Sequence, residues 1–412
     1  MNSPSMRLRA HVPAVGSAFR FVLLIGVVSL FSDMTHEGAR SVTGPFLGTL
    51  GASAAAVSWV AGLGELLGYV LRSVFGYAAD RSGRYWPITW VGYTLQMVAV
   101  PFLALVGNWP LAAGLIALER MGRAMRNPAR DAMLAHATAE LGGGRVFGVR
   151  EALDAVGGMV GPLIVALVLY LHGGYRVSFA FLAVPAVLTL LVLAVAWRQY
   201  PRPGALETAP ASPDTPEKLP AAFWIYLAAM GLIALGYADY PLVAYHFAQT
   251  RLFSTAMLPL LYAVAMASEA VFSLLLGRAF DRWGLLTVAV ATVATAAFAP
   301  LTFLGNTWLA ILGVLLWGLG MAAQESVVKA TVTLMAPRTR RASAYGLFDS
   351  GFGACWFAGS VILGTLYGQS LTALVLFSAA AQLVAVVLLL VTRSRFSFQQ
   401  AKAAGMPGPG QR

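Results

Sequence analysis

Charged side chains are scarce in this sequence of 412 residues. Only 11% of the residues are charged, less than half of the ~25% found in soluble domains. Apolar residues make up 58% of the chain. A soluble protein of this size could not bury so much apolar surface, and a disordered chain would not contain it. The composition therefore requires that a lipid bilayer supplies part of the solvent.

Cysteine and histidine are also rare. The single Cys355 excludes an internal disulfide framework, and with only five scattered histidines we expect no metal site. The sequence has no Gly-rich phosphate loop followed by Lys and Ser or Thr, no nucleophile elbow and no HExxH motif. We therefore expect a protein that is not an enzyme, is not driven by ATP and needs no cofactor.

Long apolar runs dominate the chain instead. Twelve of them are long enough to cross ~30 Å of hydrocarbon as helices. They cover 20–47, 54–79, 86–106, 110–137, 146–171, 177–197, 222–248, 256–280, 285–305, 308–336, 342–367 and 370–392. This pattern predicts an all-α integral membrane protein with twelve transmembrane helices.

A proline-containing polar stretch at 198–221 separates two sets of six spans. We expect it to be a soft linker between an N-terminal six-helix bundle at 20–197 and a C-terminal six-helix bundle at 222–392. The remaining segments, 1–19 and 393–412, are expected to be short tails.

Charged residues recur at corresponding places in the two halves. The matched pairs are Asp33 with Asp239, Glu65 with Glu269, Asp80 with Asp281, and Arg81 with Arg282. Because each half has an even number of spans, the repeats should be parallel and related by an axis along the membrane normal. The sequence therefore predicts two pseudo-symmetric bundles.

Basic residues are unevenly distributed over the connections between spans. One alternate set of connections, with both tails, holds most of the 28 Lys and Arg residues, whereas the opposite set holds Arg176 and Arg251. The positive-inside rule places both termini in the cytoplasm. The net charge of +11 is then a mark of topology, and we expect no nucleic-acid partner. The compact loops and residue usage favour a monomer in a bacterial inner membrane.

The loop after the second span carries a distinctive motif. Residues 76–84, Gly-Tyr-Ala-Ala-Asp-Arg-Ser-Gly-Arg, resemble the signature of the major facilitator superfamily, and residues 277–282 are a weaker echo in the second half. The resemblance extends over essentially the whole chain and implies two six-helix bundles that give a solute alternating access. It also implies a cytoplasmic gate formed by Gly76, Asp80, Arg81, Gly83, Arg84, Asp281 and Arg282.

Two further segments bear on coupling to protons. Arg120 in span 4 resembles a motif of proton-coupled members of the superfamily, and the run 157–162 in span 5 resembles that of drug:proton antiporters. The glycine pair expected after Pro162 is replaced by residues 163–166, Leu-Ile-Val-Ala. The motifs are thus most similar to those of drug:proton antiporters, and the departure leaves antiport open.

Most of the 17 acidic residues lie in spans or at their mouths. Each costs a few kcal/mol at mid-bilayer unless it is paired or hydrated, so their number predicts a water-filled, charged central cavity. Asp33, Glu37 and Arg40 share one helix face, which allows either a functional site or an internal Glu37–Arg40 pair. Arg120 could bind an anionic substrate or neutralise nearby acids.

We divide the intramembrane residues into two candidate groups. Candidates for proton coupling are Asp33, Glu65, Glu151 and Asp154, with Asp33 foremost because it lies near mid-membrane. Candidates for substrate binding are Glu37, Arg40, Arg120, Asp239, Glu269, Glu325 and Trp356. Glu325 could alternatively pair with Lys329, four residues further along the helix.

These observations favour a secondary active transporter that works by alternating access. Our first hypothesis is proton-coupled export of a small amphiphilic or cationic compound. The alternative is uptake of an organic anion or sugar-like solute, which Arg40 and Arg120 would favour. A hypothesis from a different class is a membrane sensor or scaffold that transports nothing, but the short tails offer no signalling domain.

Overall fold

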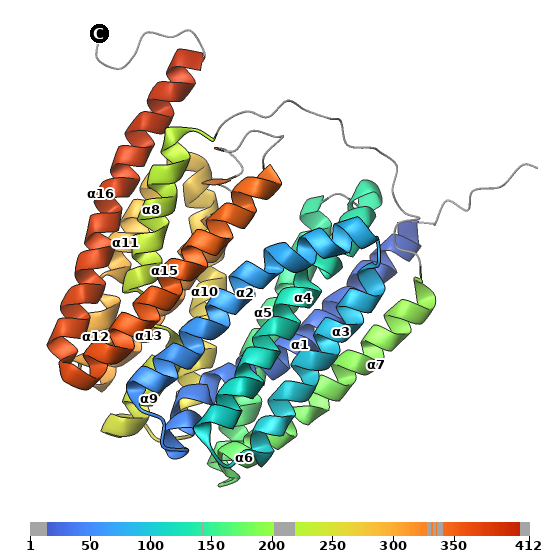
Figure 1. Cartoon of the computed structure of the whole chain (residues 1–412), viewed down its shortest axis with the longest axis horizontal. Helices are drawn as coiled ribbons and strands as arrows, with labels where there is room; N and C mark the ends of the chain where they lie inside the picture. Colours follow the sequence, from blue (N-terminus) through green and yellow to red (C-terminus); the bar gives the residue numbers. More distant parts are fainter. Residues whose placement is uncertain are drawn as a thin grey trace, which may run out of the picture.

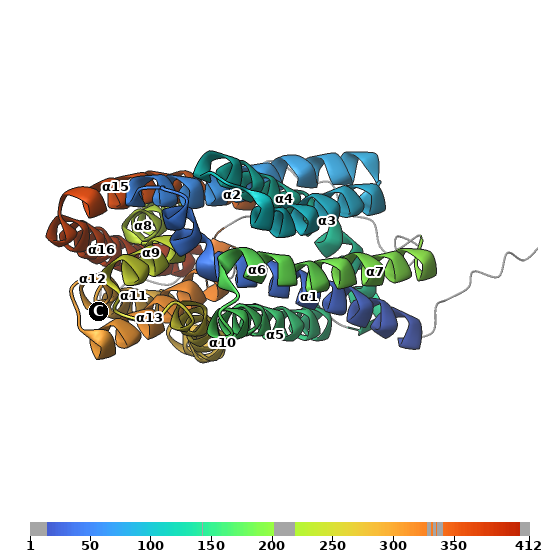
Figure 2. The ribbon, with the colours of Figure 1, turned by 90° about the horizontal axis from the view of Figure 1, so that it is seen from below.

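The computed structural model describes residues 15–141, 143–201, 219–327, 331, 332, 335 and 341–403. Most of the expected linker and of the N-terminal tail, and the last part of the C-terminal tail, lie outside these residues. All regular structure in the described ranges is helical. Figures 1 and 2 show the helices in two bundles side by side, one blue to green and the other yellow to red.

The first bundle contains six crossings. They are formed by α1 (Val15–Thr49), α2 (Ala54–Ser82), α3 (Tyr85–Phe102) with η1 (Leu103–Leu105), α4 (Trp109–Leu141), α5 (Gly143–Tyr170), and α6 (Gly174–Phe181) with α7 (Ala183–Gln199). We call the end of the molecule where α1 begins and α16 ends the terminal end, and the other the opposite end (Figure 1).

The second bundle repeats this arrangement with more interruptions. Its elements are α8 (Ala221–Gly236), α9 (Tyr240–Thr250), α10 (Met257–Trp283), α11 (Leu285–Thr295), α12 (Phe298–Phe303), α13 (Thr307–Ala322), the π-helical turn η3 (Ala323–Val327), α15 (Arg341–Gln369) and α16 (Leu371–Ala403). The last helix continues past 392, where the sequence predicted the final span to end.

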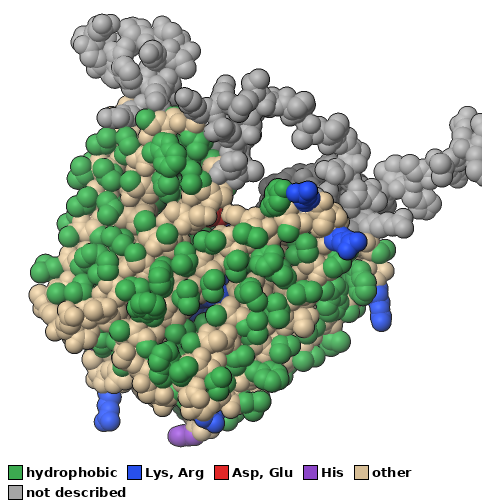
Figure 3. All heavy atoms as spheres, in the orientation of Figure 1, with side chains coloured by type: hydrophobic (Ala, Val, Ile, Leu, Met, Phe, Trp, Pro, Cys, Tyr) green, Lys and Arg blue, Asp and Glu red, His purple; other side chains and the backbone are tan. Residues whose placement is uncertain are grey.

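Twelve crossings are confirmed. In the described part of the chain, 11 helical runs are long and apolar enough to span a membrane, from Phe19–Thr49 to Leu371–Ser394. The remaining crossing is α4, a helix of 33 residues whose charged side chains lower its hydropathy. Figure 3 shows hydrophobic side chains spread over the visible flank, with the visible basic side chains mostly at the two ends. This distribution suits a hydrocarbon solvent around the middle of the molecule.

Glycines allow α5 to lie directly against α1. A Cβ added at Gly157 would lie 2.3 Å from the carbonyl oxygen of Leu30, and one at Gly161 would lie 2.1 Å from that of Met34. Only glycine permits such close backbone approach, as in other small-residue contacts between membrane helices. The glycines of the run 157–162 therefore have a packing role.

The segment between α8 and α9 is unwound, as the Gly-Tyr-Ala-Asp-Tyr-Pro sequence at 236–241 predicts. Asp239 caps the new helix by accepting a hydrogen bond from the backbone N–H of Tyr240, and Pro241 lies in its first turn. Trp317 Nε1 donates to the backbone carbonyl of Ala238 at 3.1 Å. This carbonyl, which the helix break leaves without a helical partner, is therefore hydrogen-bonded inside the protein.

Candidate functional site

A cavity of about 560 Å³ lies between the two bundles. All the sequence candidates for coupling and substrate binding line it except Asp239. The candidates on its wall are Asp33, Glu37, Arg40, Glu65, Arg120, Glu151, Asp154, Glu269, Glu325 and Trp356. Seven acids of the spans thus line one shared cavity, in agreement with the charged central cavity that their number predicts.

The cavity faces the terminal end. Its lining extends to Arg72, Arg150 and Leu274, which lie in the terminal halves of α2, α5 and α10. Toward the opposite end it is bounded by Arg40 and Arg120, which also line a second, small cavity of about 30 Å³.

Close backbone packing seals the opposite end. A Cβ added at Gly44 of α1 would lie 1.8 Å from the carbonyl oxygen of Pro241 in α9. A Cβ added at Gly364 of α15 would lie 2.5 Å from the Cβ atom of Ser58 in α2. The two bundles therefore touch through their backbones on this side, and a solute in the large cavity has no room to pass between them.

Arg40 joins the two bundles at the floor of the cavity. Its Nη2 donates to Asp239 Oδ1 at 2.9 Å and lies 3.3 Å from Glu65 Oε1. Arg120 Nη2 lies 3.1 Å from the same oxygen of Glu65. Because Asp239 is 2% exposed and holds Arg40 from α9, it acts as an inter-bundle partner and does not line the cavity.

A second inter-bundle contact involves Glu37. Tyr262 of α10 donates its hydroxyl to Glu37 Oε2 at 2.5 Å, and Arg123 Nη1 lies 3.8 Å from Oε1. Glu37 Oε1 also lies 3.6 Å from Nε2 of its neighbour His36. Arg40 pairs with Asp239 and Glu65 on other helices, and the internal Glu37–Arg40 pair considered from the sequence is not formed.

A chain of buried polar side chains runs behind the cavity wall, through α1, α3 and α4. His36 Nδ1 lies 2.8 Å from Glu119 Oε1, to which Gln96 Nε2 also donates at 2.8 Å. Arg126 Nε donates to Gln96 Oε1 at 2.5 Å, and its Nη2 lies 3.6 Å from Asp33 Oδ1. Such a network stabilises one arrangement because most of its buried polar groups are hydrogen-bonded, while Asp33 Oδ1 has only the longer contact with Arg126.

Acids on the two walls of the cavity differ in their partners. In the first bundle, Asp33 has Arg126, Glu65 has two arginines, and Asp154 lies 2.7 Å from Arg150 on its own helix. In the second bundle, no described cation forms an ion pair with Glu269 or Glu325. Lys329, the expected partner of Glu325, lies outside the described residues.

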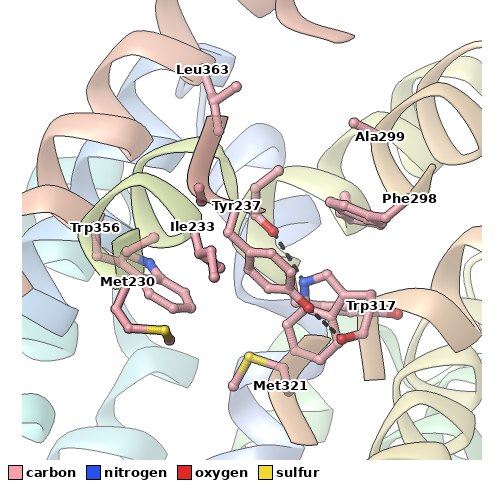
Figure 4. Packing of buried hydrophobic residues seen from close by; sticks show 14 of the residues in the cluster. Met230, Ile233, Tyr237, Phe298, Ala299, Trp317, Met321, Trp356 and Leu363 are labelled. Atoms are coloured by element: carbon pink, nitrogen blue, oxygen red, sulfur yellow. Dashed lines mark hydrogen bonds between the residues drawn. The ribbon is translucent and has the colours of Figure 1, made fainter. Parts of the chain in front are cut away.

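Apart from Ser273, the rest of the wall that carries these two carboxylates is aromatic or apolar. Met266, Met321 and Trp356 line the cavity beside Glu269 and Glu325. Figure 4 shows Tyr237 between Trp356 and Trp317, with ring centroids 5.7 and 6.0 Å away. This aromatic group holds the break between α8 and α9 in place and gives the cavity one firm wall.

The predicted gate loops lie at the terminal end. Gly83 has the positive φ of 61° that a left-handed cap of α2 requires, and Arg81 Nη1 donates to Tyr77 at 3.0 Å. The side chain of Asp80 lies outside the described residues. Where side chains are described, no ion pair connects the motif residues Arg81, Arg84, Asp281 and Arg282 to another helix, consistent with a cavity that faces this end.

Sequence reasoning missed several residues around the cavity, among them His36, Gln96 and Tyr262, and for Arg123 it favoured a role in neutralising nearby acids. A lone histidine or glutamine in an apolar span has no periodic pattern. For His36, the density of polar residues from Asp33 to Arg40 was the available signal. No group of three or more potential metal ligands is present in the part of the chain that the structure describes.

Comparisons with known proteins agree with this architecture. The sequence profile described as Major Facilitator Superfamily matches residues 22–359 and 221–406. An uncharacterized protein of Mycobacterium tuberculosis is 40% identical over 393 residues, covering 94% of this chain and 96% of that protein. An uncharacterized MFS-type transporter of Methanocaldococcus jannaschii is 26% identical over 377 residues, covering 90% and 94%.

Solved structures show the same fold. The nucleoside transporter NupG superposes with a TM-score of 0.71 at 16% sequence identity, over 90% of this chain and 99% of that one. A D-xylose-proton symporter has a TM-score of 0.69 at 14% identity, over 90% and 97%. At these identities the similarity concerns the fold alone.

Proposed function

The chain belongs to the Major Facilitator Superfamily of membrane transporters, and from this premise we propose that it exports a small amphiphilic cation in exchange for protons. It is an integral membrane protein and a secondary transporter, not an enzyme. In our proposal it works as a monomer in the bacterial inner membrane with both termini in the cytoplasm. The large cavity then faces the cytoplasm, ready to receive a solute.

The observation that carries this proposal is the pair of carboxylates on the second bundle's wall. Glu269 and Glu325 face a cavity of about 560 Å³ without a described cationic partner. A carboxylate in a confined site of low dielectric attracts a cation much more strongly than one in water. Trp356 and the neighbouring methionines supply the apolar and aromatic surface that an amphiphilic cation would contact.

Coupling to protons follows if a proton and the cation compete for the same carboxylate. A carboxylate that holds a proton is neutral and no longer attracts a cation, so alternate occupation of Glu269 exchanges one for the other. In the first bundle, Asp33, Glu65 and Asp154 are further coupling candidates, because protonation of any of them would release an arginine. Glu151, which also lines the cavity, completes this set. The motif similarity to drug:proton antiporters favours the same direction of transport.

The alternative, uptake of an organic anion, has less support. Arg40 is held by Asp239 and Glu65, and Arg120 is held by Glu65. An anion would have to displace carboxylates that are already bound and buried. A sensor or scaffold would have no need for a solute-sized cavity between two movable bundles.

A pair of ions with the same shape and opposite charge tests the proposal. Tetraphenylphosphonium is a cation and tetraphenylborate an anion of similar size. We expect the cation to raise the melting temperature of the purified protein by mass action, and the anion to have no effect. Glu269→Gln combined with Glu325→Gln should abolish the shift, whereas Asp131→Asn, outside the cavity lining, should retain it. Equal shifts with both ions would contradict cation selectivity.

A further inference from the structure

We propose that His36 is a proton-binding site and that Arg123 transmits its protonation to the substrate cavity. The proposal deepens the proposed exchange of a cation for protons and rests on it. His36 is 2% exposed and lies outside the residues that line the large cavity, whereas Arg123 lies on that lining. The two side chains contact each other, so a change in the charge of His36 acts on Arg123.

The hydrogen bonds define which nitrogen of His36 carries the proton in this structure. His36 Nε2 faces Arg120 Nη1 at 3.3 Å and contacts Arg123 Nη1. Because a guanidinium group only donates hydrogen bonds, Nε2 must accept them and carries no proton. The proton of the neutral ring is then on Nδ1, which donates to Glu119 Oε1 at 2.8 Å.

Protonation of Nε2 and the contact with Arg123 exclude each other. A proton on Nε2 turns the acceptor into a donor, and two N–H groups cannot share a hydrogen bond. Arg120 is held in place by Glu65 at 3.1 Å and Glu119 at 3.6 Å. The side chain of Arg123 is 29% exposed, and among the residues that the structure describes its one ion pair is a long contact of 3.8 Å to Glu37. Arg123 is therefore the group that moves toward the cavity.

The surroundings can hold the proton once it has arrived. Glu119 remains against Nδ1, so a protonated His36 has a counter-ion at hydrogen-bond distance. Glu37 Oε1 lies 3.6 Å from His36 Nε2 and can share the added charge, while Glu151 of α5 and Glu269 of α10 face the large cavity. Several titratable groups on elements packed against His36's helix have partners of their own. They are Glu37 with Tyr262 of α10, Asp33 with Arg126, Glu65 of α2 with Arg40 and Arg120, Asp154 of α5 with Arg150, Asp239 of α9 with Arg40, and Tyr93 of α3 with Arg126.

His36 also lies between two spaces that can contain water. The small cavity of about 30 Å³ is lined by His36, Arg40, Glu119 and Arg120, on the side of the opposite end. A water molecule needs ~10–15 Å³ of such volume, and the lining has several polar partners for it. Arg123 separates the ring from the large cavity. A proton can thus be received from one side and released to the other when the bundles rock.

The direction of the effect fits exchange of a cation for protons. With His36 neutral, Arg123 is drawn back against the imidazole and the cavity keeps its negative character. With His36 protonated, the Arg123 guanidinium moves into the cavity and repels a bound cation. Proton binding at His36 therefore weakens cation binding at Glu269 and Glu325 without any contact between the proton and the cation.

The first test measures protonation directly and needs no transport. His36→Gln retains a donor for Glu119 and an acceptor for Arg123 but cannot take up a proton. In protein labelled with ¹⁵N-histidine and placed in lipid nanodiscs, the signal missing from this variant belongs to His36. We expect that signal to change from a neutral ring to an imidazolium as the pH is lowered over the range in which the protein stays folded. A ring that stays neutral throughout would overturn the proposal.

The second test connects the proton to the cation. As the pH is lowered, the affinity for tetraphenylphosphonium should fall by up to about tenfold per pH unit over the range in which one linked group titrates. In His36→Gln and Arg123→Gln this dependence should become shallower, while Glu269→Gln should lower affinity at every pH. Wild-type pH dependence in both His36→Gln and Arg123→Gln would refute the role of His36. If His36 titrates but the wild type binds no cation, the proposed substrate class fails and the proton site stands.

Discussion

At the scale of single residues, the site is defined by which acid meets which arginine. The sequence places the charges in the membrane, and from their number a common cavity could be predicted. The sequence does not reveal how each helix is rotated relative to its neighbours. That rotation determines that Arg40 meets Asp239 across the bundle interface. The internal repeat matches Asp33 with Asp239, yet Asp33 lies on the cavity wall and Asp239 caps a helix.

Arg126 provides a prediction at this scale. It is 1% exposed, donates to Tyr93 and Gln96, and faces Asp33. Arg126→Met should lower the free energy of unfolding by roughly 3–5 kcal/mol, because a buried carboxylate loses its cation. Adding Asp33→Asn should recover part of this loss. A double-mutant cycle by thermal unfolding in detergent measures the coupling, with the more exposed Arg72→Met as control. Strictly additive effects would show that Asp33 and Arg126 do not interact.

At the scale of elements, the sequence predicts helix breaks where residues that favour turns or helix starts mark them. Pro241 and the two tyrosines beside Asp239 predict a broken, cavity-facing helix; the structure has the break between α8 and α9, but Asp239 is not on the cavity lining. Within the predicted span 308–336 the structure has a feature that the sequence did not indicate, because α13 ends at Ala322 and the π-helical turn η3 follows directly. Such a turn inserts a residue without a Gly or Pro signal, often at functional sites, so periodicity could not reveal it.

The cap of α9 provides a prediction for elements. Asp239 both caps the helix and binds Arg40. Asp239→Asn should keep the cap and lose the charge, whereas Asp239→Ala should lose both, so Ala should be the less stable variant by about 1 kcal/mol. Denaturant unfolding of both variants measures this difference. Asn306→Ala, which removes only the cap of α13, serves as control. Equal stability of the two Asp239 variants would show that the cap contributes nothing.

At the scale of the whole molecule, orientation in the membrane is a prediction from basic residues alone. Ser394 lies exposed at the terminal end and Thr255 lies exposed at the opposite end. In a Cys355→Ala background, we expect Thr255→Cys to react with an impermeant maleimide on intact bacterial cells. Ser394→Cys should react only after the cells are permeabilised, because its end is cytoplasmic. The reverse pattern would invert the topology and with it the direction in which the cavity faces.

The packing at the opposite end makes a final prediction about the balance between two states. Rocking of the bundles must separate α1 from α9 and α2 from α15 if the cavity is to open on that side. The closed arrangement depends on Gly44, since a Cβ there would lie 1.8 Å from the carbonyl oxygen of Pro241. Because that oxygen belongs to the backbone of a buried helix start, it cannot turn away as a flexible side chain would.

Gly44→Ala should therefore destabilise the closed opposite end by about 1–3 kcal/mol, the usual cost of overpacking. This is enough to shift the population roughly 5- to 150-fold toward states open on that side. Ala61 lines the small cavity behind the seal, so Ala61→Cys in the Cys355→Ala background reports the opening through its reaction rate with an impermeant thiol reagent. Gly68→Ala, where no atom lies within 4 Å of the added Cβ, should leave the rate unchanged. If Gly44→Ala also leaves it unchanged, the contact between α1 and α9 relaxes locally and does not control access from the opposite end.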